Sequence, residues 1–382
     1  MNKYLELTMT HRVDIHGKKM MGWLAPLMLA LTLMVSSCSP ATEGQEGNDA
    51  WVTLTISTGG EAAQAKASDA ASRASGSAAD KDWQVNDLTI YIFDQTGQVI
   101  GSSYASYSIN SKQDITATVK TRKAQGCTVI ALANAGTLSG TYATAQTTSP
   151  FAGVSTLSDF QQKYITFKDM ASLESAPCLL MVGYLKGFDT TSSGSSISLQ
   201  RLASRLDFTI TVMDDKDTGL PIVVDSYQLC HAPLSAYYAS ADMSSTGITL
   251  PSGTSFVEYA ANSTAFNSWT SGSNSQSYTA YVYANPATTA TDATYLLIKA
   301  HSQASNTDTR KIWQSDFKVY LTGITGPADY QLLPNYHYTI GITVQGSATE
   351  HNGVKTVYTA YPYYSSSLSP WGSNENRDLD MK

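Results

Sequence analysis

The sequence predicts an all-β fold divided into two domains. Its 382 residues are enough for two domains of ordinary size, each with its own core. Apolar residues come in short alternating runs rather than at helical spacing, and Ser and Thr are abundant. Tyrosine, with 23 residues, far outnumbers phenylalanine, with 9, which is typical of strands with one face in water.

Nine segments have the clearest strand pattern, and turn-forming residues separate them. They are residues 51–57, 88–93, 128–133, 206–212, 222–229, 278–283, 295–300, 317–321 and 338–344. The turn signals at residues 94–97 and 214–219 each predict a β-hairpin. Residues 158–170, together with those from 173 onward, are expected to hold one short helix.

Residues 1–37 are predicted to be a leader that is removed on export. The apolar run 23–35 follows two lysines and is shorter than the roughly 20 residues that cross a bilayer. Residues 35–38, Val-Ser-Ser-Cys, are similar to the lipobox of bacterial lipoproteins, in which cleavage precedes a lipid-bearing cysteine. We therefore expect a lipid on Cys38 and a polar spacer at 38–50. Ordinary secretion with a chance cysteine is the alternative.

Changes in composition mark the expected domain boundaries. A stretch rich in Ser and Gly, residues 190–196, precedes a new series of strands. This predicts an N-terminal domain at 51–198, a C-terminal domain at 199–346 and a tail at 347–382.

Within the N-terminal domain, the connector of residues 59–82 follows the strand 51–57. It has almost no large apolar side chain to bury, so we expect it to be exposed and open to proteases. Arg73 is its only arginine and is followed by Ala74. A solvated charge without a role is the alternative for Arg73.

The composition argues against several classes of function. Charged residues make up 14% of the chain and the net charge is −7, which argues against a nucleic-acid-binding surface. Motifs of zinc proteases, P-loops, dinucleotide sites and hydrolase nucleophiles are absent from the sequence, so we expect no catalysis, metal or cofactor. Cys230 and His231 are too few for a metal site, and the acidic residues of 214–217 fit a turn better than a calcium loop.

The remaining cysteines and the aromatic residues are expected to be structural. Cys127, Cys178 and Cys230 are an odd number far apart in the sequence, which favours buried free thiols and allows one disulfide at most. The tyrosines and tryptophans are expected to pack across strands. A sugar-binding platform of exposed aromatic rings is the alternative.

Several short motifs follow one another along the chain. They are Cys38 of the lipobox, WVTLTIS at 51–57, Ser-Arg-Ala at 72–74, VNDLTIYIFD at 85–94 with Gly97, LQRLASRLD at 199–207, SYQL at 226–229 with Ala-Pro at 232–233, and LPNYHY at 333–338. In this order they resemble the fimbrillin superfamily of Bacteroidetes, the type V pilins that include major and minor fimbrial subunits.

The resemblance implies two transthyretin-like β-sandwiches, export as a lipoprotein to the outer membrane, and trypsin-like cleavage between Arg73 and Ala74. In the family this cleavage releases the first strand, here residues 51–57, and a strand of another subunit fills the groove. The implied partners are other copies or related fimbrial subunits. The implied location is the outer membrane, and then a cell-surface fimbrium that supports adhesion.

The pattern of residues 51–57 suits such an exchange. Val52, Leu54 and Ile56 alternate with polar residues, so all three are expected to point into the core. At about 1.5 to 3 kcal/mol for each buried aliphatic side chain, they would hold the precursor closed until it is cut.

The tail supplies the expected donor strand. Residues 354–364, VKTVYTAYPYY, are β-prone, and Val354, Val357, Tyr358 and Tyr361 are the candidate contacts. A final edge strand of the same subunit is the alternative. Two other functions stay open: a tip or anchor subunit, and a surface lipoprotein that binds glycan or host protein without polymerising.

Overall fold

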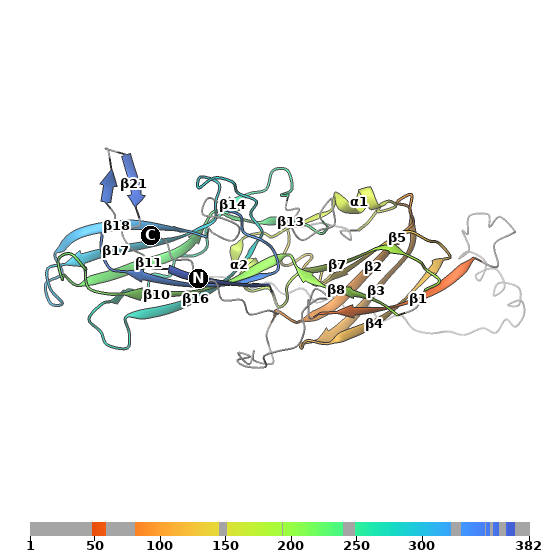
Figure 1. Ribbon diagram of the computed structural model, residues 1–382, viewed down its shortest axis with the longest axis horizontal. Helices are drawn as coiled ribbons and strands as arrows, with labels where there is room; N and C mark the ends of the chain where they lie inside the picture. The colour runs from red at the N-terminus through yellow and green to blue at the C-terminus, as the bar shows by residue number, and fades with distance from the viewer. Residues whose placement is uncertain are drawn as a thin grey trace, which may run out of the picture. The chain divides into compact units, whose positions relative to one another are not determined.

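The computed structural model describes residues 48–58, 81–144, 151–192, 194–239, 249–321, 330–347, 349–351, 354–358 and 364–370. Nearly all regular structure in these residues is β, and the strands form two sandwiches (Figure 1). The prediction of an all-β fold with two sandwiches and a strand-bearing tail is confirmed. No helix within these ranges is long and apolar enough to cross a membrane.

The elements have the following bounds. The strands are β1 Asp49–Ser57, β2 Val85–Phe93, β3 Val99–Ile109, β4 Asp114–Arg122, β5 Cys127–Ala133, β6 Tyr164–Thr166, β7 Met181–Phe188, β8 Ser195–Ser198, β9 Gln200–Arg201, β10 Ala203–Val212, β11 Ile222–Cys230, β12 Ala232–Pro233, β13 Ser235–Tyr237, β14 Phe256–Val257, β15 Phe266–Asn267, β16 Ser275–Tyr283, β17 Tyr295–Gln303, β18 Lys311–Tyr320, β19 Tyr336–Val344, β20 Thr349–His351, β21 Val354–Tyr358 and β22 Tyr364–Pro370. The helices are α1 Leu157–Gln161 and α2 Met170–Glu174.

The first sandwich packs a three-stranded sheet on a five-stranded one. The strand order is β4-β1-β8 in the smaller sheet and β3-β2-β5-β7-β9 in the larger. Alternate residues of each strand point between the sheets, so β4 buries Ile115, Ala117 and Val119 and exposes the residues between them. These side chains join those of β1, β2 and β5 in one apolar core.

The second sandwich consists of two four-stranded sheets, with the orders β16-β10-β19-β22 and β15-β11-β17-β18. β10 is central in its sheet, because it pairs antiparallel with β16 and parallel with β19. Its inward residues Leu206, Phe208 and Ile210 share a core with Leu296 and Ile298 of β17. This apolar core also includes residues of the five-stranded sheet of the first sandwich.

Two helices of five residues replace the single short helix expected in residues 158–170 and from residue 173 onward. Thr156 caps α1, and its hydroxyl accepts a hydrogen bond from the Asp159 amide while the Asp159 carboxylate accepts one from the Thr156 amide. Asp169 caps α2 by accepting a bond from the Ser172 amide. Each helix buries an aromatic or aliphatic side chain, such as Phe160 or Leu173, in the core.

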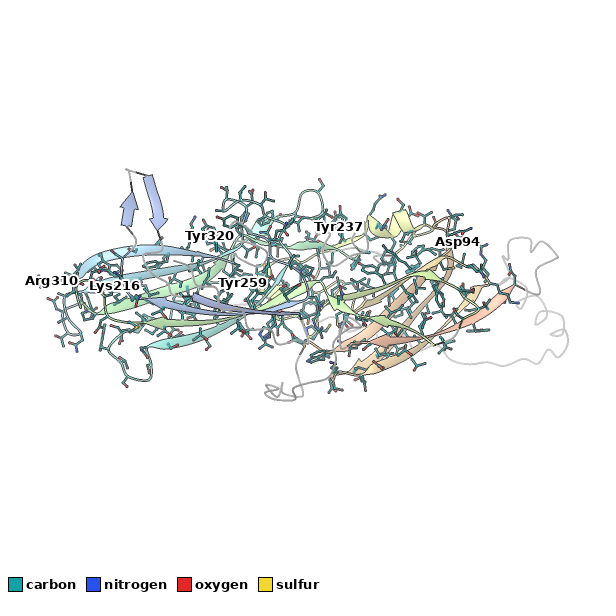
Figure 2. All side chains as sticks on the ribbon, viewed as in Figure 1. Asp94, Lys216, Tyr237, Tyr259, Arg310 and Tyr320 are labelled. Atoms are coloured by element: carbon teal, nitrogen blue, oxygen red, sulfur yellow. The ribbon has the colours of Figure 1, made fainter. Side chains whose placement is uncertain are left out.

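One of the two predicted hairpins is confirmed. β2 and β3 pair through the turn at Asp94, a residue labelled in Figure 2. The Asp94 carboxylate accepts bonds from the amides of Thr96 and Gln98. Gly97 has a φ of 81°, the left-handed conformation that glycine adopts without strain.

The second predicted hairpin, at residues 214–219, is wrong. β10 and β11, which flank this turn, belong to different sheets of the second sandwich. The buried Asp215 nevertheless builds a tight turn, because its carboxylate accepts bonds from the amides of Asp217 and Thr218 and from the Trp313 indole. A turn signal therefore located the reversal of the chain but not the partner of each strand.

The tail contains three strands in the described residues. β20 and β21 pair antiparallel with each other. β22 pairs antiparallel with β19 and so forms an edge of the sheet that contains β10.

Candidate assembly site

The predicted first strand lies in the middle of its sheet. β1 pairs antiparallel with β4 over nine residue pairs, from Asp49 with Arg122 to Ser57 with Asp114. On its other side, residues 54–57 pair parallel with residues 195–198 of β8. β8 lies close to β7, where a Cβ on Gly183 would be 2.7 Å from the Ser198 carbonyl oxygen. No strand can leave this central position without exposing both neighbours.

The side chains of β1 alternate between core and solvent. Val52, Leu54 and Ile56 each have an exposed fraction of 0%, whereas that of Trp51 is 69%. The three aliphatic side chains pack in the core of the first sandwich. β1 is therefore bound by two ladders of backbone hydrogen bonds and by apolar burial together.

β1 ends at Thr58, which is also fully buried. The Thr58 hydroxyl donates to the carbonyl oxygen of Gln113 at 3.0 Å and accepts from the amide of Gln113 at 3.1 Å. One residue earlier, the Ser57 carbonyl oxygen accepts from the amide of Leu199 at 2.8 Å. The end of the strand is thus held by polar contacts on both sides.

Arg201 is a fully buried cation at the end of β1. Its Nη2 donates to the Thr58 carbonyl oxygen at 3.4 Å, and its Nε donates to the Asp82 carbonyl oxygen at 2.7 Å. The guanidinium also lies over the Trp83 ring, 4.3 Å from its centroid. One side chain therefore contacts the last residue before the segment 59–81 and the residue directly after it.

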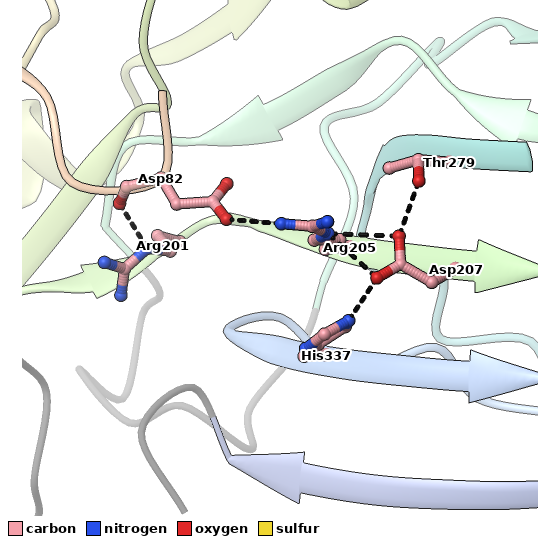
Figure 3. Close-up of polar contacts among 6 residues, drawn as sticks. All are labelled: Asp82, Arg201, Arg205, Asp207, Thr279 and His337. Atoms are coloured by element: carbon pink, nitrogen blue, oxygen red, sulfur yellow. Dashed lines mark hydrogen bonds and ion pairs between the residues drawn. The ribbon is translucent and has the colours of Figure 1, made fainter. Parts of the chain in front are cut away.

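A chain of charged groups runs from Asp82 to the second sandwich (Figure 3). The Asp82 carboxylate accepts from Nη1 of Arg205 at 3.0 Å, and Nε of Arg205 donates to both oxygens of Asp207 at 3.1 Å. Asp207 also accepts from the Thr279 hydroxyl at 2.7 Å and is 2.6 Å from Nε2 of His337.

These contacts set the charge state of Asp207. Burial by itself raises the pKa of the Asp207 carboxyl, but hydrogen bonds from His337, Thr279 and Arg205 outweigh burial and lower the pKa to about 2. Asp207 is therefore ionised at neutral pH, and its ion pair with Arg205 persists there.

Two asparagines in left-handed backbone conformations also join separate segments of the chain. The side-chain oxygen of Asn335, which has a φ of 62°, accepts from the Arg201 amide at 2.9 Å. Asn134, with a φ of 73°, accepts from the Asn86 amide and donates to the carbonyl oxygens of Gln84 and Leu179. The motifs at 85–94, 199–207 and 333–338 therefore contribute residues that join separate segments of the chain.

The predicted processing and lipid sites lie outside the described residues. These are Cys38, Arg73 and Ala74, and Tyr361 of the tail is outside them as well. Val354, Val357 and Tyr358 lie on β21, whose backbone pairs with β20. Of the tail strands that the structure describes, β22 pairs with β19 of the second sandwich. The donor role of the tail residues stays a prediction.

Sequence reasoning missed the two residues that hold the end of β1. Arg201 belongs to a motif that was noted, yet its role was not predicted. Thr58 lies two residues after Ile56, so it continues the alternation of buried residues beyond the predicted strand. This spacing could have predicted its burial from the sequence.

The three cysteines in the described residues are free and buried. Burial raises the pKa of each thiol, that of Cys178 to about 12, so all three stay protonated at neutral pH. His231 stacks on Phe256 with ring centroids 4.3 Å apart. The described residues contain no group of three or more His, Cys, Asp or Glu side chains placed to hold a metal ion.

Many of the aromatic residues pack in the interior. Tyr227, Tyr238, Tyr259 and Tyr283 are buried, and the Tyr259 hydroxyl donates to the Tyr281 carbonyl oxygen. Burial raises the pKa of Tyr259 well above its ordinary value. These tyrosines pack in the core rather than forming a surface platform.

Comparison with known proteins supports the motif-based resemblance. Residues 50–201 match the family described as the major fimbrial subunit protein (FimA). A solved fimbrilin from Porphyromonas gingivalis is similar over 83% of this chain and 97% of its own, with a TM-score of 0.52 and 12% identity. The predicted resemblance to the fimbrillin superfamily is confirmed over these matched residues.

Two further solved structures share the fold. A proposed cell adhesion protein from Parabacteroides distasonis is similar over 86% of this chain and 99% of its own, with a TM-score of 0.61 and 18% identity. Another, from Bacteroides eggerthii, covers 85% of this chain and 97% of its own, with a TM-score of 0.51 and 17% identity. At such identities the structural likeness shows the fold alone. No curated protein matches the chain by sequence.

Proposed function

Because residues 50–201 match the major fimbrial subunit family, we propose that this chain is a structural subunit of a cell-surface fimbrium, supporting adhesion without a catalytic role. The precursor is carried to the outer membrane by a lipid on Cys38, and a trypsin-like protease then cuts it between Arg73 and Ala74. Polymerisation follows by donor-strand exchange with other copies or related fimbrial subunits.

The position of β1 in its sheet is the observation that carries this proposal. β1 is central in its sheet, with β4 along its whole length and β8 along residues 54–57. The three cysteines in the described residues are free, so no disulfide among these residues ties β1 to the later strands, and the chain that follows residue 58 is the covalent link that cleavage at Arg73 would break. Cleavage in this segment would leave β1 held by non-covalent contacts alone. Its departure would expose unpaired amides and carbonyls on β4 and β8, together with the sites of three aliphatic side chains, and an incoming strand would satisfy both.

We propose that the donor strand comes from the tail, residues 347–382. Two tail segments have strand geometry, β21 with the candidate contacts Val354, Val357 and Tyr358, and β22. β22 occupies a sheet edge next to β19, and release of an edge strand breaks one ladder of backbone bonds only. Tyr361 lies between the two segments.

The processing step is tested with Arg73→Ala in the native bacterium. We expect surface-sheared material to lose the mature form that begins at Ala74 and fimbriae to be absent, because β1 stays joined to its sandwich. Lys66→Ala, which removes another basic residue of the same connector, is the matched control and should assemble normally.

N-terminal sequencing and electron microscopy measure the two outcomes. Fimbriae built from chains that still begin at Cys38 would contradict the proposal. Polymers that persist after deletion of residues 347–382 would contradict the tail as donor.

A further inference from the structure

Four residues of the first strand and its end point inward at intervals of two. Val52, Leu54, Ile56 and Thr58 all have an exposed fraction of 0%. Three of them are aliphatic, and the fourth is a hydroxyl whose donor and acceptor functions are both used by the backbone of Gln113. The position of β1 is therefore apolar along most of its length and polar at one end.

The three aliphatic side chains by themselves do not fix the register of a strand bound at the position of β1. A slip of two residues keeps every inward side chain on the inward face and restores the backbone ladder. Val52, Leu54 and Ile56 are similar in size and chemistry, so such a slip would place one aliphatic side chain where another had been. A second, directional feature is needed to choose one register.

Gln113 supplies such a feature through its backbone. A slip of two residues toward the end of the strand would place Ile56 at the position of Thr58, facing the amide and carbonyl of Gln113. The Gln113 amide would lose the Thr58 hydroxyl as its acceptor, and the Gln113 carbonyl would keep only the backbone amide that bonds to it at 3.5 Å. Because the position of Thr58 is fully buried, an aliphatic side chain there would replace these polar contacts at a cost. The correct register is the one that brings a hydroxyl to Gln113.

Arg201 supplies a second feature, because it contacts the backbone carbonyl of the same residue. A strand that stops before this residue would leave the guanidinium without that acceptor. Arg201 is not held by β1 alone: the Asp82 carbonyl oxygen and the Trp83 ring also contact its guanidinium, and the Asn335 side chain accepts a bond from its backbone amide. These three contacts come from residues that remain with the sandwich when β1 leaves.

We infer that Gln113 and Arg201 form a polar lock, which sets the register of any strand bound between β4 and β8. The lock selects a strand in which an inward apolar side chain is followed two residues later by an inward Ser or Thr. The inference rests on the proposed strand exchange and adds the chemistry of the strand that the site accepts. The occupant is a donor strand of another fimbrial subunit that carries this pattern.

The lock is tested with the full chain after cleavage at Arg73 and with synthetic peptides of residues 49–60. Native mass spectrometry measures how well each labelled peptide replaces β1. The Thr58→Val peptide keeps the shape and loses the hydroxyl, and we expect it to bind about ten- to a hundred-fold more weakly than the parent. The Thr58→Ser peptide should stay within about threefold of the parent, because it keeps the hydroxyl.

The Thr53→Val peptide is the matched control, since it makes the same change at an exposed position of the strand. We expect its affinity to stay within about threefold of the parent. A peptide that ends at Ser57 should bind as weakly as the Thr58→Val peptide or more so, because Arg201 and Gln113 both lose their partner.

The outcomes separate the two proposals. If the parent peptide replaces β1 and the Thr58→Val peptide binds equally well, the polar lock is wrong and strand exchange stands. If the parent peptide never replaces β1 after cleavage, strand exchange at this position is wrong, and the lock falls with it.

Discussion

The carboxylate of Asp207 shows how single residues tie distant strands of this protein together. It accepts bonds from Arg205 on its own strand, Thr279 on β16 and His337 on β19. A charge in a partly buried position is tolerated because these three donors replace the water that it loses.

Stability should therefore depend on pH through Asp207. Its folded pKa, about 2, lies below the ordinary value of 3.8, so its contribution is fully present above about pH 4 and is lost as the pH falls toward 2. We expect Asp207→Asn to lower the free energy of unfolding by about 2 kcal/mol at pH 7 and to flatten the pH dependence between 4 and 2. Urea unfolding across this pH range measures both.

Asp114→Asn is the control, because it removes the same charge from an exposed residue of β4. Its stability should follow that of the unmodified protein across the same range. Parallel loss of stability in the unmodified protein and Asp207→Asn between pH 4 and 2 would contradict the role given to Asp207.

The roles of such residues could not be predicted from the sequence. Arg201 contacts residues that lie 119 and 143 positions away along the chain. Contacts over such separations leave no local pattern in the sequence. The motif that contains Arg201 indicated the family, but its contacts required the structure. By contrast, the burial of Val52, Leu54 and Ile56 follows from alternation, which is a local property of one strand.

At the scale of elements, β1 should respond differently to changes on its two faces. Leu54→Ala removes a fully buried side chain, and we expect it to lower the free energy of unfolding by about 2 to 5 kcal/mol. Thr53→Ala changes the exposed face of the same strand and should cost about 1 kcal/mol or less. Denaturant unfolding of the uncut chain measures both, and equal losses would contradict the burial of one face.

The turns show where strand-level prediction reached its limit. Both turn signals correctly marked a reversal, but only the one at Asp94 joins paired strands. β10 and β11 each bury one alternating face, and this pattern is the same whether two strands pair side by side or face each other across a core. β4 was missed although its sequence, DITATVKTR, alternates strictly. Its inward residues include an alanine, which weakens the apolar signal.

At the scale of the whole molecule, the two sandwiches should unfold together. One continuous apolar core includes Phe93 and Ile130 of the first sandwich as well as Phe208 and Ile340 of the second. β13 also pairs with β6, and the residues paired between these two strands lie 69 to 73 positions apart in the sequence. We expect a single calorimetric transition with equal calorimetric and van't Hoff enthalpies. Two separated transitions would show that each sandwich unfolds alone.

The meeting of Thr58 and Asp82 at one guanidinium has a kinetic consequence. The two ends of the intervening segment are held close together, so an intact chain keeps a frayed β1 at a high effective concentration, on the order of millimolar or above, beside its own position. After a cut, rebinding of that strand becomes a bimolecular reaction. The cut itself removes none of the contacts between β1 and its neighbours; it changes the reaction order, so that dilution and competition decide which strand is present.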